Sequence, residues 1–132
     1  MAQPLAWFEA TGLPEQAFSV GKLIRTYRQV QTEIHAGQIF PIGKEPDGSE
    51  WTGFQSILTP EDGFLLVFRE ANPEQMKSVS TWLTEGDRIE LKFMAGSGKS
   101  YTTNVEQNGK VKFNLPERNS FALYRYSRIK KH

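Results

Sequence analysis

Three groups of side chains in the sequence have types that can do chemistry: a glycine-rich segment, two histidines and a set of carboxylates. Residues 95–100 end like a phosphate-binding loop, with Gly98, Lys99 and Ser100 in a row. That motif needs another glycine five residues before Gly98, where Phe93 stands, and a helix afterwards. Residues 101–103 favour a strand instead, so we expect a glycine-rich hairpin loop.

The histidines and carboxylates do not form a recognisable catalytic or metal-binding set. His35 lies alone on a predicted helix, His132 is the last residue, and the chain has no cysteine. Thiolate metal sites, disulfide scaffolds and cysteine nucleophiles are therefore excluded. A glycosidase pair needs two carboxylates across a cleft, but the candidates lie in predicted turns: Glu45, Asp47, Glu50, Glu61 and Asp62. We expect no catalytic residue, bound metal or cofactor in this chain.

The 132 residues suit one domain with a net charge of +1. The charge is uneven, because residues 1–66 carry a net −4 and residues 67–132 a net +5. The densest basic stretch, residues 124–131, is interpreted as an edge strand with a solvated tail. A phosphate-binding patch using Tyr124 and Tyr126 is the alternative.

No membrane-length apolar run or signal peptide is visible, which favours a cytoplasmic location by default.

The expected elements are one helix followed by strands. Residues 19–37 place apolar side chains at helical spacing, and Gly37 suits a left-handed cap. Pro14 suits an earlier first turn of the same helix. Residues 1–18 are assigned to an N-terminal arm, and residues 19–132 to the helix and sheet domain. About eight strands follow: residues 38–42, 51–58, 64–69, 78–83, 88–93, 101–105, 111–115 and 121–127. Asn108 and Gly109 predict a hairpin.

This pattern predicts a mainly β fold, an antiparallel sandwich of about eight strands with one N-terminal helix. The continuous apolar run of residues 64–69 indicates a strand buried on both faces. Three aromatic residues are candidates for stacking on sugar rings: Trp51, Trp82 and Tyr101. Packing in the core is the competing and preferred interpretation, above all for Trp51.

Several segments resemble the C-terminal domain of the alpha-galactosidase (melibiase-type) glycoside hydrolases. They are residues 21–28 with 36–43, then 51–55, 64–69 and 121–126, taken in this order. The resemblance covers roughly residues 20–127 and rests on strand order and character. It implies a Greek-key β-sandwich that follows a (β/α)₈ catalytic barrel. The catalytic aspartates of that family belong to the barrel, so no catalytic residue is carried over to this chain.

The resemblance implies a non-catalytic accessory domain that packs against the barrel of its parent chain. We expect Trp7, Phe8 and Phe18 to form the apolar docking patch. The main alternative is a free-standing carbohydrate-binding module. A small hydrolase and an interaction module that uses the basic tail are further rivals. Neither nucleic acid nor a membrane is expected as a partner.

Overall fold

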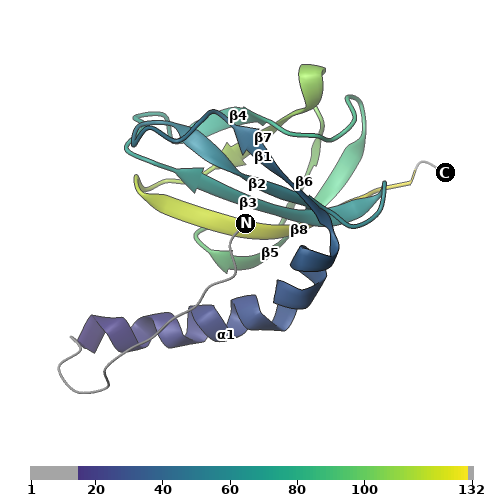
Figure 1. The fold of residues 1–132 in the computed structure, drawn as a ribbon. Coiled ribbons are helices and arrows are strands. Elements are labelled where there is room, and N and C mark those ends of the chain that lie inside the picture. Colours follow the sequence, from purple (N-terminus) through teal and green to yellow (C-terminus); the bar gives the residue numbers. More distant parts are fainter. Residues whose placement is uncertain (1–14, 131–132) are drawn as a thin grey trace.

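The computed structural model describes residues 15–130, with side chains from residue 20 onward (Figure 1). This part contains one helix, eight strands and a short 3₁₀ turn. The elements are α1 (Glu15–Ala36), β1 (Gln38–Gly43), β2 (Trp51–Ile57), β3 (Asp62–Arg69), β4 (Met76–Ser80), β5 (Arg88–Gly96), β6 (Tyr101–Asn104), β7 (Lys110–Asn114) and β8 (Ser120–Arg128). The predicted mainly β class with one leading helix is confirmed.

The strands form two antiparallel sheets. One has six strands in the order β1-β2-β3-β8-β5-β6, and the other consists of β4 and β7. Strand β3 lies between β2 and β8. Its apolar side chains face the main core on one side and α1 on the other, as the continuous apolar run of residues 64–69 predicts, although Phe68 remains partly exposed.

The main core lies between the two sheets. Side chains from both sheets meet there, among them Ile42, Leu65 and Leu91 from the large sheet and Val79, Val111 and Phe113 from the small one. The two sheets therefore enclose one apolar interior in a sandwich-like arrangement. The Greek-key connectivity stays a prediction.

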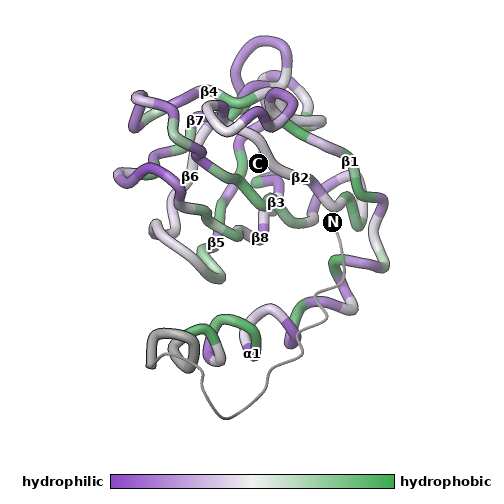
Figure 2. Tube along the Cα trace, turned by 60° about the vertical axis from the view of Figure 1, so that its left-hand side comes forward, coloured by the Kyte–Doolittle hydropathy of each residue, from purple (hydrophilic) through white to green (hydrophobic). Residues whose placement is uncertain are grey.

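A second, smaller core lies on the opposite face of the large sheet, where α1 packs. Val30 and Ile34 of α1 are buried against Phe64, Ala95 and Leu123. The Ser56 hydroxyl of β2 donates a hydrogen bond of 2.6 Å to the Ile34 carbonyl, which fixes the end of the helix to the sheet. Hydrophobic residues recur between hydrophilic ones along α1 (Figure 2), as an amphipathic helix requires.

Two strand predictions are wrong. The segment at Asn108 and Gly109 does not join a hairpin, because β6 pairs with β5 whereas β7 pairs with β4. Residues 107–109 form a 3₁₀ turn, with Asn108 at a φ of 62°, and the chain crosses there from one sheet to the other. The strand expected at residues 78–83 is Met76–Ser80, so Trp82 lies in the following loop.

The basic C-terminal strand is also not at an edge. Strand β8 lies in the interior of the large sheet, between β3 and β5. Its cations are paired: Arg125 contacts Glu33 and Asp62, at 2.9 and 3.3 Å. Arg128 contacts Asp87 at 3.2 Å, and Lys130, just beyond β8, lies 3.6 Å from Glu61. Acidic residues from elsewhere in the fold therefore offset the charge of this segment.

Gly37 ends the helix for a different reason than the predicted left-handed cap. It is absent from the glycines with positive φ. A Cβ atom at this position would meet the Ser56 hydroxyl and would lie 2.8 Å from the Ile57 carbonyl oxygen. Glycine is thus required because the helix end lies directly on β2.

We expect Gly37→Ala to lower the free energy of unfolding by about 1–3 kcal/mol, the usual cost of overpacking. Gly21→Ala is the matched control, because its added Cβ would lie 3.4 Å from the Arg25 guanidinium, in ordinary contact. Alanine favours a helix interior over glycine, so the control should gain up to ~1 kcal/mol. Urea denaturation measures both. Equal stability of the two variants would show that the helix end does not press on β2.

Candidate interaction surfaces

The outer face of the large sheet, on the side of α1, presents three rows of side chains across β1, β2, β3 and β8. The antiparallel register sets these rows. The first contains Gly43, Thr52, Phe68 and Phe121; the second Pro41, Phe54, Leu66 and Leu123; the third Ile39, Ser56, Phe64 and Arg125. Apolar side chains predominate in the first two rows taken together. Packing of another element or another protein on this face would therefore remove apolar surface from water.

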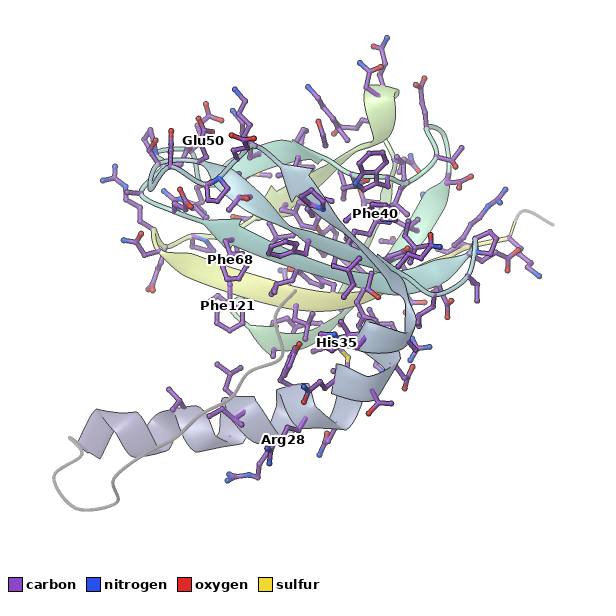
Figure 3. The ribbon with its side chains drawn as sticks, in the orientation of Figure 1. Arg28, His35, Phe40, Glu50, Phe68 and Phe121 are labelled. Carbon is purple, nitrogen blue, oxygen red and sulfur yellow. The ribbon has the colours of Figure 1, made fainter. Side chains whose placement is uncertain are left out.

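Helix α1 covers only part of this face. Its side chains pack with Ile39, Leu66 and Leu123, among others. Phe54, Phe68 and Phe121, here called the aromatic patch, are outside that cluster and remain partly exposed. The rings of Phe68 and Phe121 are 6.0 Å apart, and both residues lie toward the end of the sheet away from the last turn of α1 (Figure 3). The three phenylalanines line an open cleft of about 840 Å³.

The side chains of α1 become less buried toward its N-terminal end, within the part that the structure describes. Burial along its apolar stripe decreases from Ile34, which is inaccessible, to Val20, which is 40% exposed. Leu23 and Tyr27 are intermediate. The first half of the helix also stands apart from the strands in two views (Figures 1 and 2). The aromatic patch and this part of the helix therefore present apolar side chains on the same side of the sheet.

The residues expected to form the docking patch cannot be compared with this surface. Trp7 and Phe8 lie outside the described residues. Phe18 lies in α1, but its side chain is outside the described part. The sequence analysis missed the aromatic patch, although residues 64–69 carried a signal for it. A strand with apolar residues at nearly every position is expected to be buried on both faces. A single helix buries only part of one face of a sheet.

The three candidates for sugar stacking have different environments. Trp51 is 2% exposed and belongs to the main core, and its indole N–H donates to the Glu74 carbonyl at 3.1 Å. Tyr101 is partly buried edge-on against Tyr124, and its hydroxyl donates to the Lys112 carbonyl at 2.8 Å. Only Trp82, at 60% exposed, presents most of its ring to solvent. The structure does not join the three into one platform.

Asp47 and the glycine-rich segment have local structural roles, and the described residues form no metal site. Within residues 15–130, no group of three histidine or acidic side chains is placed to hold a metal ion. Asp47 acts in a turn, where it accepts hydrogen bonds from the Ser49 amide and hydroxyl at 2.8 Å, and these bonds lower its pKa. Residues 97–100 connect the paired strands β5 and β6, which confirms the predicted hairpin loop.

Arg69 is a buried charge that the sequence analysis did not single out. It is 4% exposed and donates hydrogen bonds to the carbonyls of Asn72 and Leu115, at 2.9 and 2.7 Å. These bonds fix the loop after β3 to the residue that follows β7. Its partners are backbone groups, so the arginine has a structural role in joining the two sheets.

Within residues 15–130, no helix has the length and hydrophobicity to cross a membrane. Comparison of the chain with known proteins found no matching family model, no matching curated protein and no matching solved structure. The resemblance to the alpha-galactosidase domain therefore stays a prediction.

We expect none of the four tyrosines to ionise at the ordinary pKa of 10.0 in the folded protein. Burial is the main cause that raises each pKa, and the negative charge of Asp62 adds to it for Tyr126. The folded pKa is thus above the unfolded one. The stability contributed by the neutral phenols is therefore complete below the unfolded pKa and is lost as the pH rises through the folded pKa.

Ultraviolet absorbance of phenolate and circular dichroism, recorded in one alkaline titration, test this expectation. Phenolate should form above the ordinary pKa and together with loss of the folded signal. The same titration in denaturant is the control, and there all four phenols should ionise near the ordinary value. Phenolate formation near pH 10.0 with the fold intact would contradict the burial of these side chains.

Proposed function

We propose that this chain is the non-catalytic C-terminal domain of an alpha-galactosidase-like glycoside hydrolase, and that it packs against a (β/α)₈ catalytic barrel and stabilises it. The observation that carries the proposal is the aromatic patch of Phe54, Phe68 and Phe121, which α1 leaves without a cover. A contiguous apolar surface of this kind, bounded by polar residues, marks a site where another protein surface packs.

The position of α1 supports a preceding domain as the occupant of this surface. A domain that comes earlier in a longer parent chain connects through the N-terminal end of α1. That end lies on the side of the large sheet that carries Phe68 and Phe121 (Figure 3). In the proposed arrangement the preceding domain packs on this face and buries the patch together with the exposed Val20.

The order of the elements supports a barrel as that domain. The resemblance to the alpha-galactosidase C-terminal domain begins at a helix and continues into the first strand, and α1 leads directly into β1 in the same way. A barrel of this class needs roughly 250 residues of its own. The chemistry of the enzyme would lie in that domain, since the resemblance carries no catalytic residue over to the present chain.

Binding of carbohydrate is the second candidate function. The exposed ring of Trp82 is the observation that favours it. Because Trp51 is buried and the Tyr101 hydroxyl is already bonded, this candidate depends on a single aromatic ring and on the polar pocket beside it. The two candidate surfaces adjoin, because Trp82 also lines the open cleft that contains the three phenylalanines.

The gene gives the first test of the accessory-domain proposal. We expect the natural reading frame to continue upstream of Leu5 through a (β/α)₈ barrel. A stop codon immediately before Met1, with no barrel encoded in that frame, contradicts the proposal and favours a free-standing module.

A binding measurement with that barrel, expressed separately, tests the docking surface. We expect the present chain to bind it, and the double variant Phe68→Ser, Phe121→Ser to bind at least ~10-fold more weakly, because aromatic residues at the centre of an interface carry much of the affinity. Met76→Ser is the matched control: Met76 is 53% exposed and lies on β4 of the other sheet. Isothermal titration calorimetry gives the three dissociation constants.

Two results would overturn the docking surface. One is equal affinity of the double variant and the control for the barrel. The other is a dimer of this chain that the double variant abolishes, since a second copy would then be the occupant. All the replaced side chains are partly or largely exposed, so cooperative unfolding of each variant, checked by circular dichroism, should be retained.

A further inference from the structure

Trp82 is exposed but held in a fixed position. Its indole N–H donates a hydrogen bond of 2.8 Å to the Pro41 carbonyl of β1, and its backbone amide donates one of 2.8 Å to the Gln55 side chain. Its ring packs on Phe40, with centroids 5.4 Å apart. A large aromatic side chain fixed in this way loses little conformational entropy when a ligand stacks on it.

A small pocket of about 210 Å³ lies beside Trp82. Its polar wall includes Gln55, Glu61, Asp87, Tyr126 and Arg128. The volume corresponds to about seven water molecules at ~30 Å³ each, and it is below the ~300–1,000 Å³ of pockets for drug-sized ligands. The pocket therefore suits a ligand the size of one six-membered ring with its substituents.

The hydrogen-bonding groups of this pocket are held in place by the fold. The Gln55 amide donates to the Tyr126 hydroxyl at 3.1 Å, and this hydroxyl has its own proton left to donate. The Asp87 carboxylate is fixed by its 3.2 Å contact with Arg128. A carboxylate and a guanidinium each have more hydrogen-bonding positions than one contact uses, so both can also bind hydroxyl groups.

These groups define the chemistry of the ligand. The ring of Trp82 matches an apolar face, and the planar carboxylate, guanidinium and amide groups match hydroxyls around an edge. Arg128 and Lys130 pair with the carboxylates of Asp87 and Glu61, so the pocket has little net charge and suits a neutral ligand. A pyranose combines an apolar C–H face with an equatorial belt of hydroxyls. We propose that Trp82 and this pocket bind one pyranose unit of a neutral carbohydrate.

The inference deepens the carbohydrate-binding candidate and does not depend on docking to a barrel. Nuclear magnetic resonance of the ¹⁵N-labelled chain tests it, with D-galactose, D-glucose and D-mannose as probes and with sorbitol as an open-chain control. We expect at least one of the three pyranoses, and not sorbitol, to shift the Trp82 indole resonance in a saturable way with a millimolar dissociation constant. The indole resonance of the buried Trp51 should not move with it.

Variants locate the binding site. Trp82→Ala should weaken binding at least ~10-fold and Asp87→Asn by a smaller factor, whereas Met76→Ala, another exposed apolar residue, should leave it unchanged. Trp82→Phe, which keeps a stacking ring, should be intermediate and covers the case in which the alanine variant does not fold. Sugar binding should persist in the Phe68→Ser, Phe121→Ser variant, so a failure of the docking proposal remains distinguishable.

The proposal is overturned if no pyranose perturbs the Trp82 resonance in a saturable way at ~20 mM, far above the concentration that half-saturates a ~1 mM site. It is also overturned if sorbitol produces the same shifts, or if Trp82→Ala and Trp82→Phe both bind as tightly as the parent chain.

Discussion

The large sheet is apolar on both faces, and this property determines what must pack around it. In β3, Leu65 and Val67 face the main core, whereas Phe64 and Leu66 face α1. Each such side chain contributes about 1.5–3 kcal/mol when it is fully removed from water. The β4–β7 sheet covers one face. The single helix on the other face leaves the aromatic patch open, so the strongest functional feature of the chain follows directly from the way its core is built.

Ion pairs connect the acidic first half of the chain to its basic second half. Arg125 of β8 contacts Glu33 of α1 and Asp62 of β3, and its guanidinium also lies 5.4 Å from the centre of the Phe64 ring. These groups are partly exposed, and exposed pairs contribute only about 0–1 kcal/mol each. Only the Glu33 pair joins α1 to the sheet, so the position of the helix depends mainly on the packing of Val30 and Ile34.

The sequence was sufficient to predict features that depend on periodicity, and insufficient for those that depend on pairing. Alternation identified most strands, and the apolar run of residues 64–69 placed β3 correctly in the interior. Alternation does not encode which strand lies alongside which, so the pairing of β7 with β4 and the central position of β8 were missed. Asn108 and Gly109 do turn the chain, but toward the other sheet. The aromatic patch combines residues from three strands, and only the register brings them together.

The proposed docking requires the aromatic patch to be open in this chain and available to a partner. Relaxation of aromatic ring protons by a soluble, uncharged gadolinium chelate measures this directly. An open patch should give strong relaxation at Phe54, Phe68 and Phe121. The rings of Phe64 and Phe113, which are 0% and 1% exposed, should show little relaxation. Equal protection of all five rings would contradict an open patch, because another segment or a second copy of the chain would then already cover it.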